Sequence, residues 1–238
     1  MAAILKFKNI FASQKDLVGS YRYHHFLNTL PQQKLNEIQL FSESDKMESL
    51  LPALYGKRVL FFYDGLHKYI FKKTLTKNPN YLLSYCYTSI KPKQQLEMPY
   101  FVMGDLDKMP LRSDFYDVVI CPFALQSNLL TPGFIKKACS LLRNGGHLIL
   151  SLRHPQLEHI LFNQNPSETF LSDNSVSSYF GALQAGHVYA EKIIEGCVDN
   201  GLKPFFSFET EKDYFAEYKN TPITLLFRGV KYSPKSGA

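Results

Sequence analysis

The chain has 238 residues, 45% of them hydrophobic and 14% aromatic, which suffices for one large domain or for a domain with an appendage. This composition excludes a disordered chain, and without a run of about eighteen apolar residues no membrane span is expected. The formal net charge of +6 comes from scattered lysines, which favours a solvated surface over a nucleic-acid-binding face.

The four cysteines show no C-x-x-C spacing, and several of them lie in apolar runs. This is typical of reduced, buried thiols in a cytoplasmic protein, so we expect no zinc site and no other metal site. Residues 1–15 lack the continuous apolar segment and the cleavage site of a signal peptide.

The first half of the chain predicts a helix followed by a strand, a helix and three more strands. A first helix is expected over 33–51. Its apolar residues are imperfectly spaced, which leaves open a break in the helix near Ser42. The apolar run 57–63 has the pattern of a strand buried on both faces, and a helix is expected over 66–77. The further strands are expected at 81–87, 99–104 and 116–121.

The second half predicts two helices and three strands. One helix, 131–146, has a threonine cap and a glycine stop, and it precedes a strand at 147–152. The polar residues 153–183 have the composition of an insertion or a lid. A second helix is expected over 185–201, and two closing strands over 203–210 and 221–231.

Strands alternating with helices predict an α/β fold with a doubly wound, mostly parallel sheet of seven strands. The last two predicted strands are joined by about ten residues without a crossover helix, so we expect an antiparallel C-terminal hairpin. We divide the chain into an N-terminal helical extension (1–44), a main domain (45–232) and a tail (233–238).

Four stretches of the sequence resemble the class I S-adenosylmethionine-dependent methyltransferases. They are 54–60, 104–121, 136–155 and 217–231, and the middle two are the most specific because several residue types recur together at the family's spacing. The resemblance implies that S-adenosylmethionine lies across the carboxyl ends of the first strands, where open α/β sheets bind their ligands.

The resemblance also exposes losses in the glycine-rich loop that follows the family's first strand. Tyr63, Gly65 and His67 occupy the three glycine places, and Phe61 stands where an acidic residue is usual. The two rings would either fill the cofactor pocket or force the loop outward. Asp64 would contact the amino group of the cofactor or serve as a turn residue, and the sequence leaves both readings open.

A second loss concerns the ribose of the cofactor. The family places a carboxylate at the end of its second strand, where this chain has Cys86. Two hydrogen bonds to a charged group contribute about 1.5–3 kcal/mol each. Losing them would weaken cofactor binding by roughly 10²–10⁴-fold, so binding is either weak or lost.

Other positions keep residue types that the family uses. The resemblance implies that Asp105 holds the adenine amino group while Leu106 packs nearby, although Asp105 also suits an ordinary turn. Gln126 stands where the family often lines its pocket, and Asp117 is expected to be structural. His154, followed by a proline, would be a general base at the rim of the active site or a loop residue.

Two functions are the main alternatives from the sequence, and a third, a basic nucleic-acid-modifying protein, rests only on the net charge. The first is a divergent methyltransferase that uses S-adenosylmethionine and acts on an acceptor expected to be a small molecule. The second is a non-catalytic methyltransferase-like protein, a pseudoenzyme whose pocket is filled by side chains and which binds a protein partner.

Overall fold

The computed structural model describes residues 32–63, 67–86, 100–104, 111–122, 131–154, 176–202, 215–216 and 219–232. The helices are α3 (Gln32–Leu50), α4 (Lys68–Thr76), α5 (Pro132–Leu141) and α7 (Val176–Ala185). The strands are β1 (Arg58–Tyr63), β2 (Tyr81–Cys86), β3 (Tyr100–Met103), β4 (Tyr116–Pro122), β5 (Leu142–Arg153), β6 (Val188–Cys197) and β7 (Pro222–Lys231).

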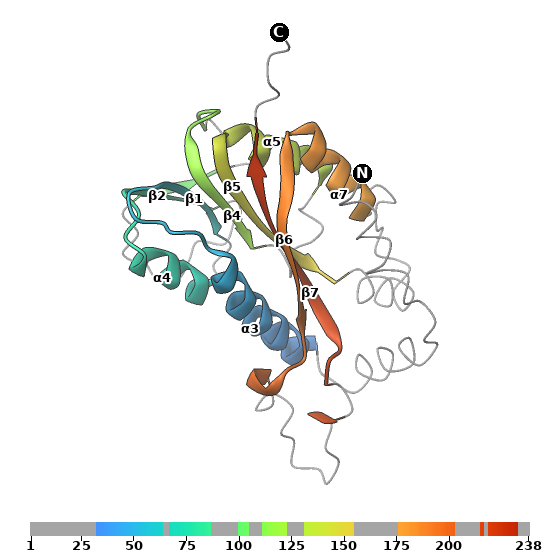
Figure 1. The fold of residues 1–238 in the computed structure, drawn as a ribbon. Helices are drawn as coiled ribbons and strands as arrows, with labels where there is room; N and C mark the ends of the chain where they lie inside the picture. Colours follow the sequence, from blue (N-terminus) through green and yellow to red (C-terminus); the bar gives the residue numbers. More distant parts are fainter. Residues whose placement is uncertain are drawn as a thin grey trace.

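The strands form one seven-stranded sheet in the order β3-β2-β1-β4-β5-β7-β6 (Figure 1). The first five strands are parallel, and β7 runs antiparallel between β5 and β6. The chain order reverses at β1, where β2 and β4 pair with its two sides. The predicted α/β fold, with a mostly parallel sheet and antiparallel C-terminal strands, is confirmed.

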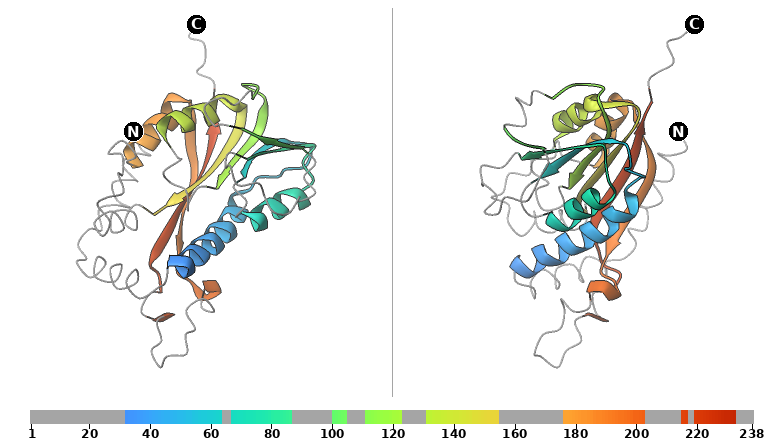
Figure 2. Two further views of the ribbon diagram at one scale, coloured as in Figure 1. Left: turned by 180° about the vertical axis from the view of Figure 1, so that it is seen from behind. Right: turned by 90° about the vertical axis from the view of Figure 1, so that its left-hand side faces the viewer.

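Side chains alternate along the buried strands and build a core on each face of the sheet. Val59, Phe61 and Tyr63 of β1 belong to the core beneath α3 and α4. Leu60 and Phe62 belong to the opposite core, beneath α5 and α7. The two views of Figure 2 show α3 running beside β6 and β7, and α5 lying next to α7.

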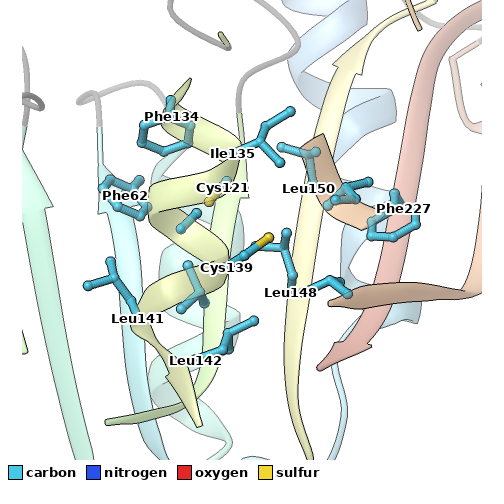
Figure 3. Close-up of a cluster of buried hydrophobic side chains, with 14 of the residues drawn as sticks. Phe62, Cys121, Phe134, Ile135, Cys139, Leu141, Leu142, Leu148, Leu150 and Phe227 are labelled. Carbon is cyan, nitrogen blue, oxygen red and sulfur yellow. The ribbon is translucent and has the colours of Figure 1, made fainter. Parts of the chain in front are cut away.

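Figure 3 shows the core beneath α5, where Phe134 meets Phe62 of β1 edge-on with ring centroids 5.0 Å apart. α5 begins at the predicted cap, since Thr131 accepts a hydrogen bond from the Phe134 backbone N–H. It ends at Leu141, before the glycine pair that was predicted to stop it. Gly145 instead has a positive φ of 74°, within a segment that already pairs with the sheet.

The prediction of a helix over 185–201 is wrong, because most of that segment is β6. Its alanine, glutamate and lysine residues suit a helix, but pairing with β7 along Val188–Cys197 provides hydrogen bonds that override this propensity. The partner of β7 in the closing hairpin is therefore β6. The strand expected over 203–210 lies outside the described residues.

Two further expectations concern α3 and the predicted lid, of which residues 155–175 lie outside the described residues. α3 is continuous over Gln32–Leu50, without a break at Ser42. The end of the predicted lid belongs to α7, whose Tyr179, Ala182 and Leu183 are buried in the core beneath α5. Among the described helices, none is long and apolar enough to cross a membrane.

Candidate active site at the carboxyl ends of the strands

The structure describes only part of the predicted cofactor site. Five predicted cofactor residues lie outside the described residues, and their assignments stay predictions: Asp64, Gly65, Asp105, Leu106 and Gln126. The described part comprises the strand ends themselves, with the flanking residues Tyr63, His67, Gly104 and His154.

The rings at two of the glycine places pack into the core on the α3 side of the sheet. Tyr63 is fully buried, and its ring lies 5.5 Å from that of Phe71 on α4 and 6.3 Å from that of Phe61. His67 is the residue that precedes α4, and it is 1% exposed. Both rings therefore lie between the sheet and its helices.

Glu43 of α3 links His67 to the end of β5. Its Oε2 lies 2.8 Å from His67 Nε2, and neither side chain is exposed. The hydroxyl of Ser151 donates a hydrogen bond to the other carboxylate oxygen, Oε1. One buried carboxylate thus joins α3, the start of α4 and the carboxyl end of β5.

His154 is buried at 3% exposure rather than lying in an open loop. Its Nε2 lies 3.5 Å from Glu195 Oε1 on β6, and its backbone N–H donates to the carbonyl of Ile223. The nearby imidazole holds the pKa of Glu195 below its usual value, against an opposing effect of burial. A histidine beside a carboxylate has the arrangement of an oriented acid–base group, and Glu195 was missed because β6 was predicted as a helix.

The described residues do not supply the ribose contact that the family uses. Residues Tyr81–Cys86 of β2 contain no carboxylate. At the end of β3, a Cβ on Gly104 would stand 2.5 Å from the Tyr85 hydroxyl oxygen, so the tyrosine explains why this position is bare. S-adenosylmethionine therefore fits the described strand ends poorly on the ribose side.

Asp117 lies at the amino end of β4, away from the candidate site, and its role is structural as expected. Its Oδ2 accepts hydrogen bonds from the backbone N–H of Arg58 at 2.8 Å and from Arg58 Nε at 3.0 Å, and its Oδ1 accepts one from Arg143. Burial alone would raise the pKa of Asp117, but these bonds hold it below its usual value.

Sequence reasoning missed the polar residues that α3 buries against the sheet. Gln39, Ser42 and Glu43 lie on its inward face, where apolar residues are normal. The signal was the imperfect apolar spacing that suggested a break. Within the described ranges, no group of three or more His, Cys, Asp or Glu residues could hold a metal ion.

Comparisons with known proteins agree with the fold described above. Residues 78–150, which run from the start of β2 into β5, match the methyltransferase domain family. An S-adenosylmethionine-dependent methyltransferase from Mesorhizobium loti is 15% identical, with a TM-score of 0.58 over 80% of this chain and 98% of that one. The chain has the class I methyltransferase fold. The resemblance to class I S-adenosylmethionine-dependent methyltransferases is thereby confirmed.

Two other solved structures share the class I methyltransferase fold. One comes from the complex between a Haloferax volcanii methyltransferase activator and its methyltransferase, with 16% identity, a TM-score of 0.62, and coverage of 84% of this chain and 93% of that one. The other is geranyl diphosphate C-methyltransferase from Streptomyces coelicolor, with 9% identity, a TM-score of 0.56, and coverage of 79% and 78%. A sequence search of curated proteins found no match.

Proposed function

We propose that the chain is a divergent S-adenosylmethionine-dependent methyltransferase that acts on a small-molecule acceptor. The observation that carries this proposal is the placement of Tyr63 and His67. The rings of Tyr63 and His67 pack in the layer beneath α3 and α4. They therefore need not occupy the crevice in which the cofactor would bind. The resemblance assigns cofactor contacts to Asp64, Gly65, Asp105, Leu106 and Gln126.

The small-molecule acceptor is supported by a structural neighbour. The Streptomyces coelicolor enzyme was crystallised with geranyl diphosphate and S-adenosyl-L-homocysteine. In such an enzyme the bound cofactor supplies the methyl group, and the protein contributes mainly by positioning and by excluding water. His154, oriented by Glu195, is the proposed proton acceptor.

Calorimetric titration with S-adenosylhomocysteine tests the proposal. We expect saturable binding that is weaker than in methyltransferases with a ribose carboxylate. Replacing the residue at the ribose position, Cys86→Asp, should tighten binding by roughly 10–100-fold, since hydrogen bonds to a charged group contribute about 1.5–3 kcal/mol. Cys86→Asn is the matched control and should gain much less, because its amide carries no charge.

A second candidate is a non-catalytic methyltransferase-like protein that binds a protein partner. The burial of Ser151 and His154 at the carboxyl end of β5 favours it, because protein atoms cover these side chains. The Haloferax volcanii complex gives a precedent for a methyltransferase with a protein activator. If neither the wild type nor Cys86→Asp binds S-adenosylhomocysteine at millimolar concentration, the enzyme proposal fails and this candidate stands.

A further inference from the structure

Three buried polar side chains on α3 and β7 have no hydrogen-bond partner among the described residues. They are Gln39 and Ser42 of α3 and Thr224 of β7, with exposures of 0%, 3% and 0%. The atoms without a partner are the nitrogen and the oxygen of the Gln39 amide and the hydroxyl oxygens of Ser42 and Thr224. Buried polar groups in native proteins almost always have a partner, so a group of them without one indicates that a polar molecule belongs there.

The two hydroxyls converge on one point of β6. Gly196 pairs with Thr224 across the sheet. A Cβ added to Gly196 would collide with the Thr224 hydroxyl oxygen and would stand 2.6 Å from that of Ser42. The bare backbone of Gly196 thus leaves room for hydroxyls that arrive from α3 on one side and from β7 on the other.

The chemistry of these groups selects an uncharged ligand. Each hydroxyl can donate and accept a hydrogen bond, and the Gln39 amide adds donors and an acceptor. The neighbouring carboxylate of Glu43 already holds His67 and Ser151, and its presence disfavours an anion. A hydroxyl or a carboxamide matches this mixture of donors and acceptors.

Ser42 and Thr224 lie close to the residues of the candidate active site. Ser42 precedes Glu43, which contacts His67, the residue at the third glycine place. Thr224 pairs with Arg153, the last residue of β5 and the neighbour of His154. Ser42 is therefore adjacent in sequence to a residue that contacts His67, and Thr224 lies opposite the neighbour of the proposed base.

We propose that Gln39, Ser42 and Thr224 form a recognition site for an uncharged hydroxyl or carboxamide group of the methyl acceptor. This inference rests on the proposed function for the identity of the ligand. The site itself rests on the three unpartnered side chains and on the convergence of the Ser42 and Thr224 hydroxyls at Gly196, which hold whether or not the cofactor binds.

Nuclear magnetic resonance titration of the ¹⁵N-labelled full chain with acetamide tests the site, because acetamide is small enough to enter by local opening. We expect saturable shifts of amides in α3, β6 and β7, with a dissociation constant on the order of millimolar for so small a probe. Thr224→Val removes the hydroxyl at nearly constant shape and should weaken binding at least about tenfold; Ser42→Ala should act in the same direction. Ser49→Ala, an exposed serine on the same helix, is the control and should leave the shifts unchanged.

Sodium acetate serves as the charged counterpart of acetamide. Equal binding of acetate would overturn the assignment of an uncharged ligand. Absence of saturable shifts with acetamide would show that the site holds only water, which also overturns the proposal. Because the titration contains no cofactor, acetamide binding without S-adenosylhomocysteine binding would reject the methyltransferase proposal while the site stands.

Discussion

The carboxylate of Glu43 and the imidazole of His67 meet 2.8 Å apart in the interior, although 24 residues separate them along the chain. Glu43 lies on α3, and the resemblance to class I methyltransferases predicts that His67 stands at one of that family's glycine places. The contact shows how the chain accommodates an imidazole there: a helix on the sheet's face provides a buried polar partner. Buried ionisable groups require such partners, so the contact couples α3 to the loop of the candidate site.

Glu43→Ala should destabilise the protein by about 3–5 kcal/mol, because it leaves His67 and Ser151 buried without their shared carboxylate. Urea unfolding at neutral pH would measure the change. Glu48→Ala on the same helix is the control, since Glu48 contacts Lys73 at the surface, where solvent screens the pair, and should change the stability much less. A double-mutant cycle with His67→Ala that shows no coupling would contradict the contact.

Asp117→Asn should destabilise the protein at neutral pH and lose this effect in acid. The folded-state pKa of Asp117 is depressed, so its contribution is present above the unfolded pKa of about 3.9 and disappears as the pH falls through the folded value. Urea midpoints of the variant and the wild type should therefore converge below about pH 4. A gap between the two midpoints that stays constant over this pH range would refute the assignment.

Two glycines should respond to alanine in opposite directions. Gly196→Ala should destabilise by about 1–3 kcal/mol, because its methyl group would collide with the hydroxyl of Thr224. Gly181 lies within α7 with nothing near its Cβ position, so Gly181→Ala should stabilise by about 0.5–1 kcal/mol. Thermal unfolding of both variants measures the contrast, and equal effects would contradict the described packing.

The buried thiols should resist alkylation in the native protein. Burial raises the pKa of Cys139 to about 12 and that of Cys121 well above its ordinary value, so almost no thiolate forms near pH 8. Iodoacetamide labelling followed by peptide mass spectrometry should modify both only in denaturant. Half-buried Cys197, with a pKa raised to about 11, should react sooner, and faster labelling of Cys139 than of Cys197 would disprove this order.

The sequence predicted most of the sheet because its central strands are continuous apolar runs between turn residues. β1, β2, β3 and β4 lie within one residue of the predicted ranges, and the family resemblance supplied the topology. β6 escaped prediction since its alanine, glutamate and lysine residues also suit a helix, and only pairing with β7 decides between the two. Local propensity carries no information about that partner.

The candidate site was less predictable, because its described contacts join residues distant in sequence. Ser151 lies 108 residues from Glu43, and Glu195 reaches His154 from a strand that was predicted as a helix. The resemblance marked Tyr63 and His67 as abnormal, but it could not show where their rings would go. Their direction depends on the packing of α3, whose buried polar residues have no counterpart in the motif.

α3 rests on β7, and the guanidinium of Arg228 donates to the carbonyl of Leu50 across 178 positions of the chain. A nascent polypeptide therefore emerges from the ribosome with this helix long before the surface that receives it has been translated. Until then the buried residues of α3 lack the surface that covers them in the folded protein. Deletion of α3 and deletion of β7 would consequently damage the same interface and produce similar folding defects.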